Sequence, residues 1–383
     1  METDKVNYQA EIFANRLRKR YSHLKKWARR TGAGVFRLYD RDIPEIPLAC
    51  DLYCLETGGE DISLHSPAEA AYLLMYLYQR PYEKDAADEA VWLDSMANAA
   101  AGALDIPGVR ILRKVRRRQR GAAQYEKTMD PAPVTGLVRE QGLRFLVDLT
   151  SHLDTGLFPD HRPLRDLVRR ESAGKRVLNL FCYTGAFSVY AASGGARVVT
   201  SVDLSRTYLE KARQNMAING FAGQRDIAFV RNDVSAFLAG AAGKGGRWDI
   251  IVLDSPTFSN SKAVEGVLDI NAQWPALVRA CLAVLESPGT LFFSTNSRRL
   301  KFDPAVLPRS LAVTDISGRT IPEDFSHLPH RVWRIDSRCA GDSGVWDSAP
   351  TISAERWLRV TAMSCQTAIV EKIRGEKRTT FWR

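Results

Sequence analysis

The stretch from Lys175 to Asp203, KRVLNLFCYTGAFSVYAASGGARVVTSVD, decides the fold. Its two ends, residues 175–181 and 196–203, are short apolar runs separated by a segment of helical period. Further apolar runs follow at residues 226–233, 248–254 and 289–295. The segments between them again have helical period, and several end in glycine. This alternation is typical of βαβ units, so the sequence predicts an α/β fold with a doubly wound, mostly parallel sheet.

Most of these predicted strands end in polar residues, and parallel strands would gather those ends at one edge of the sheet. Ligands of doubly wound sheets bind outside that edge, where the strand order reverses. Asp203 ends the second strand and is placed to accept hydrogen bonds from both hydroxyls of a ribose. Asn232 and Asp233 end the third and can approach an adenine edge. Each acidic strand end alone is equally a helix N-cap, but several in register favour a nucleotide-type ligand.

The turn after the first strand narrows the choice of ligand. Neither a GxGxxG fingerprint nor a P-loop is present, so a pyrophosphate lacks its usual binding loop. An NAD-linked oxidoreductase, the generic alternative for this fold, is therefore disfavoured. S-adenosylmethionine has no phosphate and needs one tight turn for its methionine end, which Gly185 can provide. The sequence thus predicts S-adenosylmethionine as the cofactor.

The fourth strand ends in Asp254-Ser255-Pro256-Thr257-Phe258, which bears on chemistry. In many nucleic-acid methyltransferases an Asn or Asp, followed by prolines and an aromatic residue, surrounds the target base. The acidic side chain then holds a base edge, the proline stiffens the turn and the aromatic ring stacks on the base. We therefore expect Asp254, Pro256 and Phe258 to be the catalytic residues, although a phenylalanine taken alone is more often a core residue.

The chain has 383 residues, with 54 Lys and Arg against 44 Asp and Glu, for a formal net charge of +10. Eight basic and no acidic residues lie between Arg16 and Arg30, on a predicted amphipathic helix. Seven more lie between Arg110 and Arg120, in a predicted strand and basic turn, and the C-terminal tail is basic again. One such cluster is usually a solvated face, but three favour RNA phosphates as the partner. The residues expected to bind RNA are Arg16, Arg18, Lys19, Arg113, Lys114, Arg116, Arg117, Arg118 and Arg120.

Other classes of protein are disfavoured by composition. The six cysteines include no CxxC pair, so neither a zinc ribbon nor a disulfide framework is indicated, and no metal is expected. The apolar run at residues 70–78 is too short to cross a bilayer, and the first 13 residues show no apolar signal segment. We expect a reduced cytoplasmic protein without a membrane partner, and the oligomeric state stays open.

Several segments resemble one family. They are LDTGLFPDHR (153–162), NLFCYTG (179–185), SVDLSRTYLEKARQNMAING (201–220) and DSPTFSNSK (254–262). The family is that of the 23S rRNA guanine-N7 methyltransferases, the RlmK-type half of the bifunctional RlmKL enzymes. NRLRK (15–19), YDRDIPE (39–45) and RQRGAAQYEK (118–127) are similar to the N-terminal part of that half. The similarity spans roughly residues 13–335.

The resemblance implies a Rossmann-like class I methyltransferase domain at residues 151–336, which uses S-adenosylmethionine. A small α+β RNA-contacting domain at residues 1–150 would precede it, and an extension of unassigned role at residues 337–383 would follow. The implied partner is 23S rRNA or a large-subunit precursor. The implied cofactor neighbourhood comprises Asp160, Arg162, Asn179, Phe181, Tyr183, Thr184, Gly185, Asp203, Leu204, Asn232, Asp233 and Asp254. His161 either closes this site or is a packed structural residue.

Two positions depart from the family pattern. The family usually has Asp-Pro-Pro, and Ser255 replaces the first of those prolines, which should loosen the turn. Cys182 stands where serine is commoner, which we expect to be neutral.

The type of methylation follows from what each reaction demands. Carbon 5 of cytosine becomes nucleophilic only after a thiolate adds to carbon 6, and related cytosine enzymes carry that cysteine just after the fifth strand. Thr295 stands there, which disfavours a cytosine-C5 enzyme. Guanine N7 has an exposed lone pair and no proton, so alignment suffices. The sequence predicts guanine-N7 methylation, and a non-catalytic RNA-binding ribosome-assembly protein remains the alternative, to which Ser255 gives weight.

Overall fold

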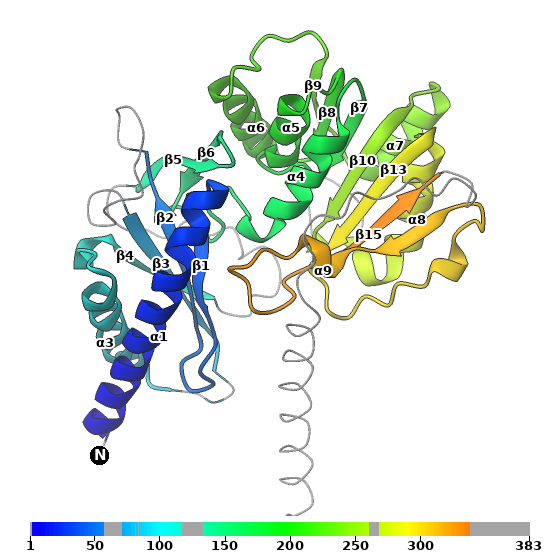
Figure 1. The fold of residues 1–383 in the computed structure, drawn as a ribbon. Helices are drawn as coiled ribbons and strands as arrows, with labels where there is room; N and C mark the ends of the chain where they lie inside the picture. Colours follow the sequence, from blue (N-terminus) through cyan, green and yellow to red (C-terminus); the bar gives the residue numbers. More distant parts are fainter. Residues whose placement is uncertain are drawn as a thin grey trace, which may run out of the picture. The chain divides into compact units, whose positions relative to one another are not determined.

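The structure is a computed structural model that describes residues 2–56, 71–80, 82, 84–116, 133–259 and 268–337 (Figure 1). Residues 1–340 form one compact unit, and every element below belongs to it. The predicted C-terminal extension, apart from residue 337, lies outside the described residues. The predicted domain boundary at residue 150 stays a prediction.

Two long helices and a four-stranded sheet make up the N-terminal part. The sheet has the order β1 (Val35–Asp40), β2 (Leu48–Cys54), β3 (Ala71–Tyr78) and β4 (Ile111–Arg116). The first three strands are antiparallel, and β4 is parallel to β3. The helices are α1 (Glu2–Thr31) and α3 (Ala86–Leu104). The strand expected near Arg110 is present as β4, and the helix expected around Arg16–Arg30 is part of α1.

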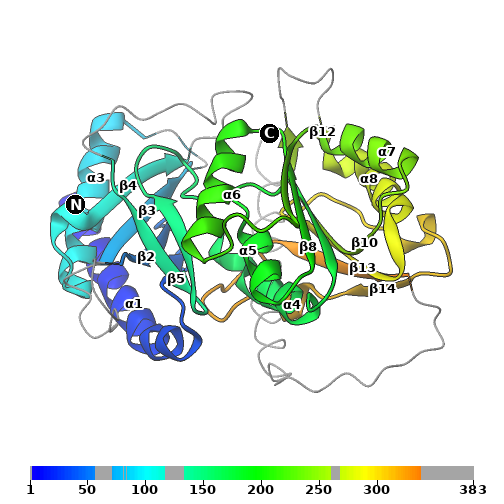
Figure 2. The same cartoon turned by 90° about the horizontal axis from the view of Figure 1, so that it is seen from above.

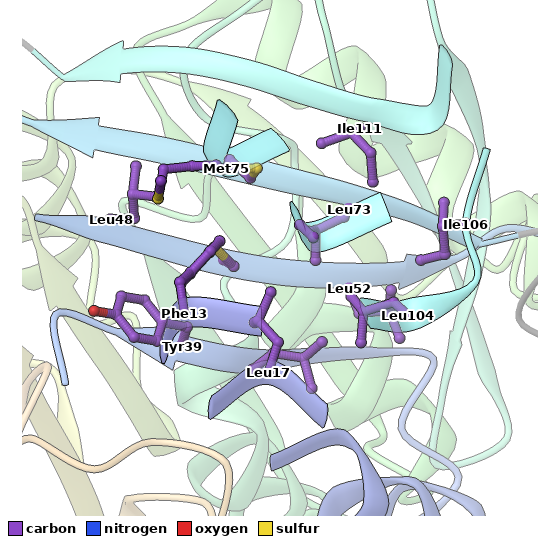
Figure 3. Packing of buried hydrophobic residues seen from close by; sticks show 14 of the residues in the cluster. Phe13, Leu17, Tyr39, Leu48, Leu52, Leu73, Met75, Leu104, Ile106 and Ile111 are labelled. Carbon is purple, nitrogen blue, oxygen red and sulfur yellow. The ribbon is translucent and has the colours of Figure 1, made fainter. Parts of the chain in front are cut away.

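The helices cover one face of this sheet because their apolar stripes meet its buried residues. Figure 3 shows Phe13 and Leu17 of α1 facing Leu52 and Leu73 on the strands, all almost fully buried. The exposed side of α1 carries its basic residues. The predicted amphipathic helix is therefore present, and it begins well before Arg16.

A hairpin that the sequence analysis did not predict follows. It consists of β5 (Thr135–Glu140) and β6 (Leu143–Asp148), joined by the two residues Gln141 and Gly142. Both have positive φ (50° and 86°), as a tight two-residue hairpin turn requires. Val138 and Glu140 form isolated bridges to the N-terminal part of the chain.

The second sheet has seven strands in the order β14-β15-β13-β10-β7-β8-β9. Their bounds are β7 (Arg176–Leu180), β8 (Val198–Asp203), β9 (Ile227–Arg231), β10 (Trp248–Ser255), β13 (Leu285–Thr295), β14 (Ala312–Asp315) and β15 (Arg331–Asp336). Strands β7, β8, β9, β10 and β13 are parallel, and they are the five apolar runs of the sequence. β15 runs antiparallel to both β13 and β14. The predicted doubly wound, mostly parallel sheet is confirmed.

Helices cover both faces of this sheet. They are α4 (Arg162–Glu171), α5 (Ala186–Ser193) and α6 (Arg206–Ile218) on one face, and α7 (Val234–Gly243) and α8 (Ile270–Ala283) on the other (Figure 2). The buried cluster beneath α4, α5 and α6 also takes in Val35, Tyr53 and Leu74 from the four-stranded sheet. One hydrophobic core is thus shared by both sheets.

None of the helices in the described ranges is long and apolar enough to span a bilayer.

Candidate active site

The order of strands reverses between β7 and β10, so the carboxyl ends of these two strands mark the expected ligand position. The predicted residues Asn179, Asp203 and Asp254 all lie at or near the carboxyl ends of strands in this part of the sheet. The turn after β7, residues 181–185, leads directly into α5.

The turn after β7 is unusually constrained. Phe181, Tyr183 and Gly185 have φ values of 53°, 50° and 76°, in the left-handed region. A Cβ on Gly185 would lie 2.7 Å from the Cβ of Ala212 on α6, so a larger residue would push that helix away. The turn therefore packs closely against α6 at Gly185, and the contact of Gly185 with a cofactor stays a prediction.

Asp203 at the end of β8 supports this turn. Its carboxylate accepts hydrogen bonds from the backbone N–H of Tyr183 (3.0 Å) and of Ser205 (2.8 Å). Burial raises the pKa of Asp203 above its ordinary value, although backbone N–H groups, including that of Leu204, act to lower it. Both oxygens retain lone pairs for a further donor such as a ribose hydroxyl.

Asn179 supplies an unsatisfied acceptor below the turn. Its amide donates to Ser188 Oγ (2.9 Å), and that hydroxyl contacts Ser201 Oγ (2.7 Å). Its Oδ1 is buried and accepts no hydrogen bond from the described chain, which is uncommon in a native interior. The methionine end of S-adenosylmethionine carries an ammonium group, a donor of the kind this position lacks. Asn179 and Asp203 thus fit that molecule by their donor and acceptor chemistry.

The remaining predicted cofactor residues lie either in the turn after β7 (Tyr183 and Thr184) or just after β9 (Asn232 and Asp233). Tyr183 packs against Phe158 (ring centroids 5.3 Å apart) and Tyr208 (4.6 Å), which forms an aromatic wall beside the turn. Thr184 is buried and donates its hydroxyl to Gly156 O (2.6 Å), so its side chain holds the turn together. Asp233 caps α7 by accepting from Ala236 N (2.9 Å), as the alternative N-cap interpretation required, and Asn232 is exposed beside it.

Arg162 requires a correction. Its guanidinium donates to Glu140 Oε2 (3.1 Å), Asp324 Oδ1 (3.2 Å) and the backbone oxygen of Val35 (2.5 Å), and its side chain is 3% exposed. Arg162 is the last residue of the segment 153–162 that resembles the family. Its side chain points into the interior, whereas those of Asp160 and His161 point toward the strand ends. Arg162 is therefore a structural residue and not a cofactor contact.

Asp254, the predicted catalytic carboxylate, lies at the end of β10 beside β13. The parallel register places Asp254 opposite Ser294 and Ser255 opposite Thr295. The Asp254 side chain is 26% exposed, whereas Ser255 is buried and donates to Pro256 O (3.1 Å). Phe258 follows at 59% exposure, so it is not a core residue.

A further polar contact joins this turn to the segment that follows β13. Thr257 Oγ1 donates to Asn296 Oδ1, which ties the Asp254–Phe258 turn to the end of β13.

A chain of buried polar groups lies behind Asp254. His161 Nε2 is 2.9 Å from Ser294 Oγ and 3.3 Å from Asp254 Oδ1, and its Nδ1 is 3.2 Å from Asp160 Oδ2. The same Asp160 oxygen is 2.9 Å from Nδ1 of His330, the residue that precedes β15. His161 is thus buried and contacts the predicted catalytic carboxylate, and its closing of the cofactor site stays a prediction.

The charges in this chain stabilise one another. Burial acts to lower the pKa of His161, but Asp254 and Asp160 outweigh it and raise that pKa to about 10. Burial likewise acts to raise the pKa values of Asp254 and Asp160, but His161 holds both below their ordinary values. The pKa of His330 is lowered by burial and by the charge of His161. At neutral pH the chain therefore contains two carboxylates, one imidazolium and one neutral imidazole.

Asp160, His161 and His330 also bring ligand-type atoms within 4.8 Å of one another, which raises the question of a metal ion. The two imidazole rings are stacked, with centroids 4.1 Å apart and planes 27° apart. An imidazole lone pair lies in the plane of its ring, so two stacked rings cannot both direct a nitrogen at one ion without turning. The geometry therefore favours a network of ion pairs and hydrogen bonds over a metal site. In that network Nδ1 of His161 has an ion-pair contact with Asp160 but no hydrogen bond from the described residues.

Sequence reasoning missed Ser294 and His330 as site residues. Ser294 stands in the run where only a cysteine was sought, and its place opposite Asp254 follows from the strand register. His330 lies 170 residues from Asp160, and no local pattern marks it.

The predicted RNA-binding residues differ in how free they are. Arg18 and Lys19 are exposed on α1. Arg16 pairs with Asp42 (2.6 Å), and Arg113 pairs with Asp94. Lys114 donates to the backbone oxygens of residues 152 and 153. The side chain of Arg116 and all of Arg117, Arg118 and Arg120 lie outside the described residues.

Comparisons with known proteins give matches over most of the chain. A family model described as S-adenosylmethionine-dependent methyltransferase matches residues 65–313. The ribosomal RNA large subunit methyltransferase K of Neisseria meningitidis serogroup B is 44% identical over 324 residues, which are 84% of this chain and 86% of that protein. The ribosomal RNA large subunit methyltransferase K/L of Stutzerimonas stutzeri is 43% identical over 340 residues. That match covers 88% of this chain but 44% of the relative, so the chain spans less than half the length of the K/L proteins it matches.

Solved structures show the same fold. A chain assigned as a methyltransferase and complexed with SAH superposes with a TM-score of 0.64 at 22% identity, covering 85% of this chain and 81% of that one. A SAM-dependent methyltransferase from Agrobacterium tumefaciens gives a TM-score of 0.52 at 20% identity, over 76% of this chain and 88% of that one.

Proposed function

Because this chain belongs to the S-adenosylmethionine-dependent methyltransferases, in the family of ribosomal RNA large subunit methyltransferase K, we propose that it methylates N7 of a guanine in 23S rRNA. The observation that carries the proposal is the partly exposed Asp254 carboxylate, held ionised at strand ends where the described residues supply no thiol nucleophile.

The lack of a suitable thiol follows from the cysteines in the described ranges. Burial raises the thiol pKa of Cys50, Cys54, Cys182 and Cys281. A raised pKa disfavours the thiolate that a cytosine-C5 mechanism needs. Thr295, where related enzymes of that type would carry the cysteine, is itself buried. The observed residues support a reaction that needs alignment rather than covalent catalysis.

The cofactor residues bind and orient. Bound S-adenosylmethionine supplies an electrophilic methyl group on a sulfonium. In this proposal Asp203 accepts from the ribose hydroxyls, and Asn179 Oδ1 accepts from the ammonium group. The turn at residues 181–185 brings its backbone close to the methionine end, and Tyr183 with Phe158 keeps water from one side of the site.

Asp254 provides the selectivity for guanine. The Watson–Crick edge of guanine offers two donors, N1–H and N2–H, which match the two oxygens of a carboxylate. As N7 gains a methyl group the base gains positive charge, so its bond to an ionised carboxylate becomes stronger in the transition state than in the ground state. The exposed ring of Phe258 is available to stack on the base, as an extruded nucleotide requires.

The RNA is held by charge outside the cofactor site. Arg18 and Lys19 lie on the exposed side of α1, and among the described residues Arg18 donates only to Asn15 Oδ1 (2.9 Å), an exposed bond that a phosphate can replace. Phosphate contacts there would give affinity without choosing a base. Such an enzyme would act on 23S rRNA or on a large-subunit precursor, in the cytoplasm where ribosomes are assembled.

The test is to map 7-methylguanosine in 23S rRNA by chemical cleavage at the modified base, in cells with and without this gene. We expect one guanine to lose its methyl group in the deletion strain and to regain it when the gene is restored. An unchanged map overturns the proposal. Loss of a 5-methylcytosine instead would establish the cytosine alternative, and loss of assembly without loss of a methyl group would establish the non-catalytic one.

A further inference from the structure

The polar groups behind Asp254 come from four separate elements and form a continuous chain. Asp160 and His161 lie in a short helical turn, η3 (Pro159–His161), Asp254 ends β10, Ser294 lies on β13 and His330 precedes β15. The parallel β10–β13 register brings Asp254 beside Ser294, and the antiparallel return of β15 brings His330 to the same end of the sheet. A binding function alone would not require this arrangement, since an exposed carboxylate can accept hydrogen bonds without support.

We propose that His161 is a positioning residue that fixes the Asp254 carboxylate, with Asp160 anchoring the imidazole from its other side. This inference rests on the proposed function and adds to it the device that keeps Asp254 charged and oriented. The His161 ring contacts Asp254 through Nε2 and Asp160 through Nδ1, at 3.3 and 3.2 Å.

Ser294 sets the direction of the carboxylate. Its hydroxyl is 2.9 Å from His161 Nε2 and also hydrogen-bonds to Asp254. The imidazolium N–H can donate to the serine oxygen while the serine O–H donates to the carboxylate. Asp254 is thereby held by both the ring and the hydroxyl on its buried side, and its exposed side remains free for a base.

The groups around His161 show which charges its imidazolium can stabilise. The titratable groups that face the ring are Asp160, Asp254 and His330, and its other neighbours are Ser294 and the ring of Phe187. His330 stacks on it and hydrogen-bonds to Asp160 and to Thr320. A second cation at His330 would repel the first, so the stacked pair holds one positive charge.

The pH dependence of the methylation rate distinguishes a positioning role for His161 from a merely structural one. With the imidazolium present, Asp254 stays ionised into mildly acidic solution. Without it, burial is opposed only by the weaker effects of the Ser294 hydrogen bond and of His330, so the pKa of Asp254 should rise and an increasing fraction of the enzyme would carry a protonated, neutral acid as pH falls. A residue that only packed the interior would change the rate equally at every pH.

The experiment compares His161→Gln with wild type, with His327→Gln as the control because His327 is exposed and outside the site. The first readout is the carboxyl pKa of Asp254, measured by carbon-13 NMR on the purified full chain. We expect His161→Gln to raise it by about one unit or more, and His327→Gln to leave it unchanged. Asp160→Asn, which retains the ring but removes its anchor, should shift it in the same direction by less.

The second readout is the single-turnover methylation rate of 23S rRNA across the pH range. We expect the deficit of His161→Gln to deepen about tenfold between about pH 8 and about pH 5.5. Calorimetric binding of S-adenosylmethionine, expected to be unchanged, confirms that the variant is folded.

An unaltered Asp254 pKa, or a rate deficit that is the same at every pH, overturns the positioning role. Inactive wild-type enzyme on 23S rRNA would instead overturn the proposed function, and the Asp254 pKa would still decide whether His161 acts on that carboxylate.

Discussion

Two buried ionic networks begin within six residues of each other and differ in how they end. Asp160 and His161 join a network that finishes at Asp254, whose side chain is 26% exposed. Arg162 and Arg165 join one that closes on Glu140 and Asp324, all with side chains at most 3% exposed. Both satisfy their charges internally, so burial of charge alone does not mark a functional site. The feature that indicates a functional site is a network of charges with one carboxylate, that of Asp254, exposed to solvent.

The closed network joins distant parts of the chain. Arg165 donates twice to Glu140 Oε1 (2.8 and 2.6 Å), and Arg162 reaches the backbone of β1. Asp324 also accepts from the backbone N–H of Arg37 (3.0 Å). This network therefore fixes the four-stranded sheet to α4, whereas the open network is local to the strand ends.

The largest expected effect tests the closed network. Glu140→Ala should lower the free energy of unfolding by about 3–5 kcal/mol, because two buried guanidinium groups lose a shared partner. Urea unfolding measures it. The control is Glu210→Ala, whose exposed pair with Arg213 (3.4 Å) should be worth less than about 0.5 kcal/mol. A loss for Glu140→Ala as small as that of the control would contradict a structural role for this network.

Asp254→Ala tests the open network and should act on rate. We expect the single-turnover methylation rate to fall by about 100-fold or more, because a charge aimed at the transition state is removed, while RNA binding is retained. Asp226→Ala, at an exposed aspartate outside the site, is the control. Unchanged turnover would remove Asp254 from the mechanism. A stability loss as large as that of Glu140→Ala would break the distinction between the networks.

Stability should also depend on pH through His161. Its pKa is about 10 in the folded protein and about 6.5 when unfolded, so the stabilisation is fully present below about pH 6.5 and is lost as pH rises toward about 10. Over that window the unfolding free energy of wild type should fall relative to that of His161→Gln by up to about 1.4 kcal/mol per pH unit. Unfolding curves at several pH values measure it, and a gap that stays constant would show that His161 is not charged when folded.

The smallest effect is expected from charges that are neither buried nor paired in a network. Replacing both Arg18 and Lys19 by glutamine should weaken RNA binding for all sequences and reduce the salt slope of log K by about 1 per residue. Filter binding at several salt concentrations measures the slope. Lys244→Gln, at an exposed lysine at the end of α7, should leave the slope unchanged. An unchanged slope in the double variant would place the RNA elsewhere.

Much of the fold is predictable because its signals are local. The five parallel strands are apolar runs, and Asp203 and Asp254 stand out because each ends such a run. The hairpin β5–β6 also has a local signal, two alternating runs separated by Gln141 and Gly142, which the sequence analysis did not use.

The part of the site that was not predicted depends on long-range pairing. Ser294 reaches Asp254 through the β10–β13 register, and His330 reaches Asp160 through the return of β15. Arg162 was misassigned because its neighbours in the family string do lie at the site, and one residue of helical rotation turns it inward.

The hydrophobic core shared by the two sheets limits how this enzyme could be rebuilt. Val35, Tyr53 and Leu74 of the four-stranded sheet pack in the same cluster as Val177 and Val199 of the seven-stranded sheet. Grafting the N-terminal part onto another methyltransferase would expose that apolar surface unless the receiving protein supplied a matching one. The N-terminal part is thus not an interchangeable adaptor. If RNA contacts the exposed face of α1 as proposed, a change of RNA target is more readily engineered on that face than by exchanging modules.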